Sequence, residues 1–203
     1  MSKVNKQESK YFNTARIFDE TLIILLEQKD INYITVKEIC AKAGFNRSTF
    51  YLHYDSIDDL LNETLEHTVD KLVKYFKETP QEFIDKINTS SKEDLVLVNE
   101  KYLRPYLEFI KENKKIFMAS FKSSSTMKTY EAYSGLEKYI FNPILNRYNI
   151  NDNKKKYILK FYTQGIMAII KEWTVNDCKD DIENIISIII DCVFSGNFKN
   201  SNL

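Results

Sequence analysis

Apolar residues recur along this chain every three or four positions, which is the period of an amphipathic α-helix. Behind a polar N-terminal arm, the first such stripe predicts a helix over roughly residues 13–28. The positions that form its apolar face are Phe18, Thr21, Leu22, Leu25 and Leu26. Two short helices are predicted next, at about 35–43 and 47–53. A long helix then runs from about 56 to 79, where Pro80 ends it.

The rest of the chain keeps the same helical period. We expect further helices at about 80–89, 92–112, 114–121, 126–148, 152–175 and 179–195. Because proline interrupts the hydrogen bonds of a helix, Arg104-Pro105 should restart one helix and Asn142-Pro143 should kink or break another. With 4 Gly and 3 Pro in 203 residues, the chain also has few residues for the tight turns of a β-sandwich or barrel. The prediction is an all-α fold.

Capping signals join the second and third predicted helices. Thr35 precedes Glu38 by three residues, which is the spacing of a capping box. Gly44 follows the last apolar position of that helix and suits a left-handed C-cap, and Asn46 can cap the helix after it. Two short helices joined by a tight turn that contains glycine have the geometry of a helix-turn-helix. The spacing alone also fits a simple packing hairpin.

The composition of the third predicted helix favours DNA binding over simple packing. Its first turn reads Arg47-Ser48-Thr49, a guanidinium followed by two hydroxyls, which a helix made only for a core would not place there. Such side chains at the start of a recognition helix reach base edges in the major groove. The helix starts at Thr35 and Asn46 also offer backbone N–H groups to phosphates.

Residues 34–54 and the segment after them resemble the TetR/AcrR family of transcriptional regulators. The run reads ITVKEICAKAGFNRSTFYLHY and is followed by Asp58-Asp59-Leu60-Leu61. It is in register with the capping box, A-G turn, T-F-Y, histidine and closing leucine of that family. The match covers about the first 60 residues, and the rest shares only the helical character of the family's regulatory domain. The resemblance implies a three-helix helix-turn-helix DNA-binding domain at 1–58 and a helical effector-binding and dimerisation domain at 59–203.

The resemblance also implies roles for individual residues. Thr35 and Lys37 would meet phosphates, while Tyr51 and His53 would reach the backbone or flanking bases. The first turn of the third helix would face base edges, with Arg47 the candidate to read a guanine. The full predicted DNA-binding set is Thr35, Lys37, Asn46, Arg47, Ser48, Thr49, Tyr51 and His53. The implied function is a transcription regulator, most often a ligand-responsive repressor, on a palindromic double-stranded DNA operator, with activation left open.

One position departs from the family pattern. Where the family usually has a phosphate-binding lysine opening the fourth helix, this chain has Ile57. Loss of a phosphate contact in each monomer predicts weaker binding and a lower salt dependence. It leaves open an alternative function, a co-regulator of the same fold that acts through a protein partner with weak or no direct DNA binding.

The last two predicted helices are apolar around more of their circumference than surface helices need. A surface helix carries one apolar stripe about a third of its circumference wide, and the segments 157–173 and 182–194 exceed it. They must be buried on two sides, against their own domain and against a second surface. A homodimer through a four-helix bundle is the favoured interpretation, and a monomer with two deeply buried core helices is the alternative.

Aromatic residues at helical spacing occupy much of the second domain. Such residues are usually core, but so many tyrosines also suit an effector pocket lined by rings and a few hydroxyls. The candidate ligand-binding residues are Phe76, Tyr102, Tyr106, Phe109, Phe117, Phe121, Tyr130, Tyr133 and Trp173. The predicted effector is a small apolar or aromatic molecule.

The net charge is zero, with 29 Lys+Arg and 29 Asp+Glu. This balance excludes binding to nucleic acid by bulk charge alone, although Lys37, Lys42 and Arg47 give the two short helices a local excess of positive charge. The polar N-terminus has no signal-peptide core, and no stretch is long enough to span a bilayer, so a cytoplasmic protein is expected. Three cysteines without CxxC spacing predict reduced, mostly buried thiols.

Sequence motifs for catalysis are absent. The chain has no GxGxxG, P-loop, HExxH or G-x-S-x-G motif, and its two histidines do not allow a catalytic set to be proposed. Glu63 and His67 could share a metal ion, but a solvated pair at this spacing is far more common. Neither enzymatic activity nor a cofactor nor a metal site is predicted. A small helical enzyme or metal protein is the remaining alternative.

Overall fold

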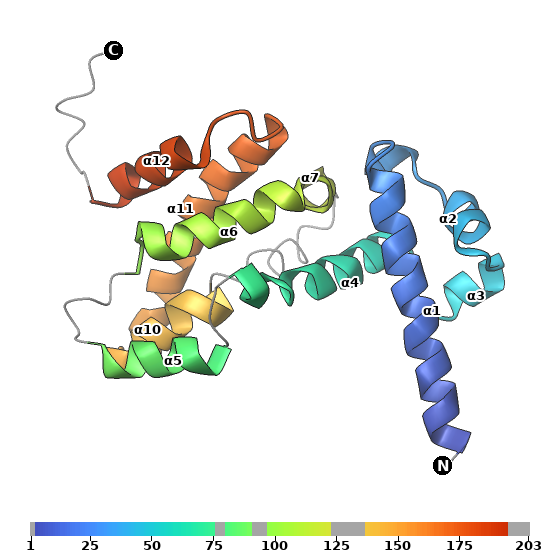
Figure 1. Ribbon diagram of the computed structural model, residues 1–203, viewed down its shortest axis with the longest axis horizontal. Coiled ribbons are helices and arrows are strands. Elements are labelled where there is room, and N and C mark those ends of the chain that lie inside the picture. The colour runs from blue at the N-terminus through green and yellow to red at the C-terminus, as the bar shows by residue number, and fades with distance from the viewer. Residues whose placement is uncertain (1–2, 76–79, 91–96, 123–136, 195–203) are drawn as a thin grey trace. The chain divides into compact units, whose positions relative to one another are not determined.

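The computed structural model describes residues 3–75, 80–90, 97–122 and 137–194. Its ordered elements in these ranges are all helical, which confirms the all-α prediction (Figure 1). Tertiary contacts divide the chain into two compact units, residues 1–68 with 115–132 and residues 69–114 with 133–203. The sequence predicts a boundary after residue 58 between a DNA-binding and an effector-binding domain. That boundary separates functions and not packing units, so it stays a prediction. None of the described helices is long and apolar enough to cross a membrane.

The first unit holds the helix-turn-helix. Its elements are α1 (Lys3–Leu26), the 3-10 turn η1 (Ile31–Tyr33), α2 (Val36–Ala43), α3 (Arg47–Tyr51), α4 (Ile57–Val69) and, from residue 115 on, α7 (Lys114–Lys122). Figure 1 shows α2 and α3 on the same side of α1. There the ring of Phe18 lies 5.3 Å from that of Phe45 and 5.5 Å from that of Phe50, between centres. Phe18 and Phe50 are fully buried, so this aromatic core attaches the helix pair to α1.

The second unit is built around α6 and the two last helices. Its elements are η2 (Leu72–Tyr75), α5 (Pro80–Thr89), α6 (Glu100–Glu112), the π-helical segment η3 (Glu137–Phe141), α10 (Asn142–Arg147), α11 (Asp152–Val175) and α12 (Ile182–Phe194). Helix α6 contacts η2, α11 and α12, and α5 contacts α10. The side chains of Tyr106, Phe109, Ile170 and Trp173 are fully buried in this unit. Arg104 of α6 also pairs with Glu183 of α12 at 2.5 Å, which joins these helices at the surface.

Helix α1 begins at Lys3, well before the predicted start at residue 13. The segment before residue 13 contains neither proline nor glycine, so nothing in it stops a helix. The apolar stripe also continues backwards from Phe18 through buried Ala15 to Tyr11, and the Tyr11 ring stacks on that of His53 with centres 4.0 Å apart. The polar arm is therefore part of the helix rather than a separate tail.

The predicted long fourth helix is shorter in the structure. Helix α4 ends at Val69 and is followed by the 3-10 turn η2, whereas the sequence pattern predicts one helix to residue 79. Leu72 is fully buried and lies three residues after Val69, a spacing that a 3-10 turn satisfies as well as an α-helix does. Apolar periodicity alone could not distinguish a 3-10 turn from a continued α-helix. Residues 76–79 lie outside the described part of the chain.

Three other boundaries differ from the predictions. Helix α3 ends at Tyr51 rather than at about residue 53, and α12 begins at Ile182 rather than at about 179. Helix α6 begins after Asn99, whose side chain accepts a hydrogen bond from the Tyr102 N–H at 3.1 Å, and it continues through Pro105. The N-cap thus sets the start of α6, and Pro105 does not restart it. The predicted segment 126–148 is described only from residue 137.

At Asn142-Pro143, where the sequence predicts a kink or a break, the π-helical segment η3 passes directly into α10, so the helical hydrogen-bonding pattern changes there without a gap. The prediction for the cysteines holds in part. Cys40 and Cys178 are buried, and burial raises the pKa of both thiols, but Cys192 is exposed on α12. The sequence pattern could not show this difference because α12 is apolar on more than one face.

Replacing Gly44 by alanine is expected to destabilise the first unit. Gly44 is the C-cap of α2, with φ +76° and ψ 25°, and its N–H donates to the Cys40 carbonyl. A side chain costs about 1–2 kcal/mol in this left-handed conformation. Since a Cβ at Gly44 meets no atom within 4 Å, the loss comes from the backbone and not from a clash. Urea unfolding of Gly44→Ala measures it.

The matched control is Gly44→Asn, because asparagine tolerates the left-handed region better than alanine does. The asparagine variant is expected to lose clearly less stability than the alanine variant. Equal losses in both variants would contradict this account of the turn.

Candidate nucleic-acid interface

The start of α2 is closed by the predicted capping box. The Thr35 hydroxyl oxygen accepts from the Glu38 N–H at 3.3 Å, and the Glu38 carboxylate accepts from the Thr35 N–H at 3.1 Å. Lys29 also donates to Glu38, and this bond and those from Thr35 lower the pKa of the glutamate. Lys37 is exposed in the first turn of α2. The helix start therefore presents a lysine beside a carboxylate that is held as a structural cap.

The start of α3 is organised by Asn46. Its side-chain oxygen accepts from the Thr49 N–H at 2.8 Å and from the hydroxyls of Ser48 and Thr49 at 2.6 and 2.8 Å. Both hydroxyl protons are therefore committed to the cap. In this arrangement Ser48 and Thr49 offer outside groups their oxygen lone pairs, together with the Thr49 methyl group. The cap holds the first turn of α3 in one conformation and limits the hydroxyls of Ser48 and Thr49 to accepting hydrogen bonds.

Arg47 lies in this first turn of α3 and is exposed. Its guanidinium makes no ion pair or hydrogen bond with any residue that the structure describes. Lys37 and Lys42 of α2 are exposed as well, and Tyr51 at the end of α3 is 57% exposed. The helix pair thus carries three exposed cations and one exposed aromatic side chain.

His53 lies just beyond α3 and is half buried. Its Nδ1 is buried and has no hydrogen-bond partner among the described residues, and its ring stacks on Tyr11. Burial lowers the pKa of His53, against the weaker opposing effect of Glu63. Burial therefore favours the neutral form of the ring over the charged form. Tyr11, absent from the predicted set, supports this ring. The apolar stripe of α1 extends back to Tyr11, and following it in the sequence would have predicted that Tyr11 packs against the helix pair.

The start of α4 differs in charge from the start of α2. Ile57 is its first residue, and Asp58 and Asp59 follow in the first turn. The Ser56 hydroxyl accepts from the Asp59 N–H at 3.2 Å and so caps this helix start. Two carboxylates at this helix end repel phosphate instead of attracting it.

The predicted effector residues are divided between the two units. Tyr102, Tyr106, Phe109 and Trp173 are buried in the second unit. There the Tyr106 hydroxyl lies 3.6 Å from the Met167 sulfur, and the Trp173 ring N–H donates to the Asp180 carbonyl at 3.0 Å. Those polar groups are already used within the core.

The other predicted effector residues fall elsewhere. Phe117 is buried and Phe121 half buried in the first unit. Phe76, Tyr130 and Tyr133 lie outside the described residues. Grouping of the nine residues around one effector therefore stays a prediction.

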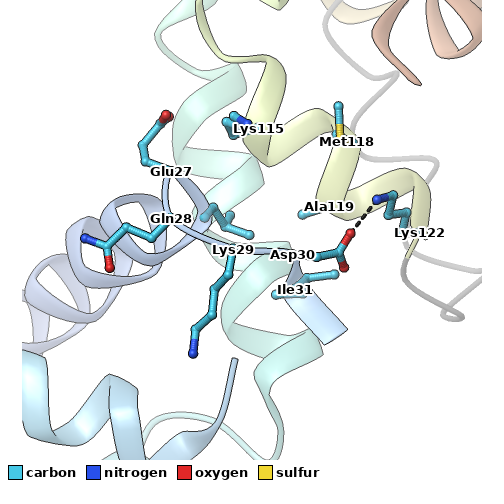
Figure 2. A pocket seen from close by; sticks show the side chains of 10 residues that line it. Glu27, Gln28, Lys29, Asp30, Ile31, Lys115, Met118, Ala119 and Lys122 are labelled. Carbon is cyan, nitrogen blue, oxygen red and sulfur yellow. Dashed lines mark hydrogen bonds and ion pairs between the residues drawn. The ribbon is translucent and has the colours of Figure 1, made fainter. Parts of the chain in front are cut away.

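A cavity of about 190 Å³ lies in the first unit where α1 ends (Figure 2). It is lined by residues 26–31 and by Lys115, Met118, Ala119 and Lys122. Figure 2 shows Lys122 paired with Asp30, and this bond, followed by one from the Asn32 N–H, lowers the pKa of Asp30. Pockets for drug-sized ligands usually hold about 300–1,000 Å³ and are mostly apolar. This smaller, charged cavity contains none of the predicted effector residues that the structure describes.

Two family models match the chain. The model described as "Bacterial regulatory proteins, tetR family" matches residues 21–64, which include the whole helix-turn-helix. The model described as "Transcriptional regulator C-terminal region" matches residues 99–195. Together they reach both compact units.

One curated relative and one solved structure agree with these models. The "Uncharacterized HTH-type transcriptional regulator YxbF" of Bacillus subtilis (strain 168) is 29% identical over 100 residues. That alignment covers 48% of this chain and only 24% of the relative. The "Dihydroxyacetone kinase operon activator DhaS" has the same fold, with a TM-score of 0.55 and 18% identity over 89% of this chain and 93% of that one. The chain belongs to the TetR family of bacterial transcriptional regulators, with α2 and α3 as its helix-turn-helix.

Proposed function

We propose that this chain is a sequence-specific DNA-binding repressor that works as a homodimer on a palindromic operator and is released by a small ligand. The observation that carries the proposal is the start of α3, where a capped turn presents Arg47, whose guanidinium has no ion-pair or hydrogen-bond partner among the described residues. As a regulator of bacterial transcription it would work in the cytoplasm. We propose no catalytic activity.

In this proposal the start of α2 contacts phosphates and the start of α3 contacts bases. Lys37 and the N–H groups at the start of α2 would hold phosphate, which positions the helix pair without reading sequence. Arg47 would form the paired hydrogen bonds to the O6 and N7 atoms of guanine. Ser48 and Thr49 would accept hydrogen bonds from the amino groups of adenine or cytosine, because their own protons are bound to Asn46. Tyr51 and His53 would contact the DNA backbone or flanking bases.

Binding of the purified full-length chain to the DNA upstream of its own gene tests this function. Fluorescence anisotropy in a salt series, with unrelated DNA of equal length as competitor, separates specific from general binding. We expect a specific complex that weakens as the salt concentration rises. A shift that unrelated DNA abolishes equally well, or no binding at low salt, would favour the co-regulator that acts through a protein partner.

Restoring a lysine at the start of α4 is expected to strengthen DNA binding. Ile57→Lys places a cation beside Asp58 and Asp59, in a first turn whose charged residues are both acidic. One added phosphate contact per monomer is two per dimer, which should steepen the dependence of log K on log salt by about 1.8. The same anisotropy series measures it, and Ile57→Gln is the uncharged control. An unchanged salt dependence would mean that this helix end lies away from the DNA.

The proposed dimer uses the exposed face of α11 and α12. Tyr157 and Phe161 are one helical turn apart on α11 and are 70% and 71% exposed. Gly165 is one turn further along, and a Cβ there would meet nothing within 4 Å. On α12, Ile188 is exposed too. Large exposed apolar side chains beside a small residue suit close packing against the same face of a second copy.

The proposed effector site lies in the second unit, near Tyr102, Tyr106, Phe109 and Trp173. These buried rings favour a small apolar or aromatic molecule, although their hydroxyl and N–H groups already have partners where the structure describes them. Release from DNA requires only that the ligand bind one dimer geometry better than the other.

A further inference from the structure

Three metal-binding side chains from two helices meet in the first unit. Asp19 comes from α1, and Glu63 and His67 come from α4. Each supplies one ligand atom, and these three atoms all lie within 4.8 Å of one another. The sequence spacing indicated only Glu63 and His67. Asp19, 48 residues before His67, joins them through the packing of α1 against α4.

Neighbouring hydroxyl groups already orient the two carboxylates. Thr64 donates to Oδ1 of Asp19 at 2.7 Å, which leaves Oδ2 directed at His67. The Tyr54 hydroxyl donates to Oε1 of Glu63 at 3.1 Å. Such outer hydrogen bonds fix the direction of metal ligands and are a regular feature of metal sites. Here they hold one oxygen of each carboxylate, while the other oxygen of Asp19 is bonded to His67 Nδ1, a bond that a metal ion between the two atoms would replace.

The distances need little change to accept an ion. His67 Nδ1 lies 2.6 Å from Asp19 Oδ2, in a direct bond between the two side chains. Zinc binds histidine nitrogen at about 2.0–2.1 Å and carboxylate oxygen at about 2.0–2.2 Å, which places neighbouring ligand atoms a little over 3 Å apart. The His67 side chain is 53% exposed, so it can move by the required amount and water can complete the coordination.

We propose that Asp19, Glu63 and His67 bind one divalent transition-metal ion that bridges α1 and α4. The charges favour such an ion, because two carboxylates face a single imidazole and a 2+ cation neutralises both. One nitrogen and two oxygens suit zinc and its first-row neighbours, whereas Mg²⁺ prefers oxygen ligands alone and keeps several of its waters.

Zinc titration of the full-length, chelator-treated protein tests the proposal without DNA. Isothermal titration calorimetry with Zn²⁺ is expected to give one site per chain, and Mg²⁺ is expected to give none at the same concentration. Bound Zn²⁺ should also raise the melting temperature, since an ion that binds the folded state stabilises it. Failure here leaves the proposed DNA binding unaffected, because neither measurement contains DNA.

Three variants locate the site. His67→Gln and Asp19→Asn should each lower zinc affinity at least about tenfold, on the scale that losing even supporting residues has at metal sites. Glu20→Gln removes the exposed carboxylate next to Asp19, where it pairs with Arg16, and should leave the affinity unchanged. His67 is exposed enough for its variant to fold, and far-UV circular dichroism checks both.

Cobalt supplies a spectroscopic readout of the same site. Co²⁺ in place of zinc should give visible absorption bands that depend on His67. Absence of stoichiometric Zn²⁺ binding would overturn the proposal. Equal binding by the wild-type chain and by folded His67→Gln would overturn it as well, since the ion would then sit elsewhere, for example at exposed Cys192.

Discussion

Replacing Arg47 by alanine is expected to lower affinity for the operator by at least about thirtyfold, because the dimer loses two paired arginine–guanine contacts of about 1–3 kcal/mol each. Arg47 is exposed and has no ion pair or hydrogen bond with any described residue, so its removal should not cost folding stability. The loss should be confined to the specific sequence. Affinity for unrelated DNA should fall far less, and the base preference at one operator position should relax.

Two further variants make the Arg47 result interpretable. Lys37→Ala should weaken binding to all sequences alike and reduce the salt slope by about 2, as expected when a dimer loses one phosphate contact from each monomer. Lys171→Ala removes an exposed cation from α11 and should change neither quantity. If Arg47→Ala instead behaves like Lys37→Ala, then Arg47 contacts phosphate and the base reading lies elsewhere on α3. If it changes nothing, the DNA-reading role of α3 fails.

Replacing Phe161 by glutamate is expected to convert the dimer to monomers. Phe161 is 71% exposed on α11, next to Tyr157 and Gly165 on the same face. In the proposed dimer this side chain is buried at the centre of the interface, where truncation of an aromatic anchor costs about 2 kcal/mol or more and a buried charge costs further energy. Sedimentation velocity at micromolar concentration should give the wild type about twice the chain mass of 24.0 kDa, and the variant a single chain.

Tyr33→Glu is the matched control for Phe161→Glu. Tyr33 in η1 is 73% exposed, so the same chemical change is made at an equally accessible aromatic side chain in the other unit. This variant should sediment as the wild type does. A wild-type chain that already sediments as a monomer at micromolar concentration would contradict the dimer, and so would a Phe161→Glu variant that keeps the dimer mass.

The turn between α2 and α3 was predictable from the sequence almost residue by residue. The box between Thr35 and Glu38, the left-handed Gly44 and the Asn46 cap all occur as their spacing indicates. Each depends on bonds between residues no more than four positions apart, so local sequence is sufficient to specify them. The sequence predicted helix ends that lack such caps less accurately. Helix α4 passes into a 3-10 turn after Val69, although the apolar spacing continues to buried Leu72.

The sequence predicted where the site residues lie better than it predicted their hydrogen bonds and protonation. Both Ser48 and Thr49 stand where the first turn of α3 was expected, but their hydroxyl protons are bound to Asn46. Likewise, His53 lies beyond the helix end, stacked on Tyr11 and with its pKa lowered by burial. These properties depend on which atoms surround a side chain, and spacing along the chain does not reveal them.

By itself, the sequence determined the helical class and the helix-turn-helix, because periodicity and caps act over a few neighbouring residues, and its resemblance to known regulators indicated the family. Only the tertiary structure decided which apolar faces the chain covers for itself. On α11 it buries Ile170 and Trp173 and leaves Phe161 exposed, a choice that a pattern apolar on several faces cannot specify. It also decided that Asp19 reaches His67, because a contact across 48 residues depends on how α1 packs against α4.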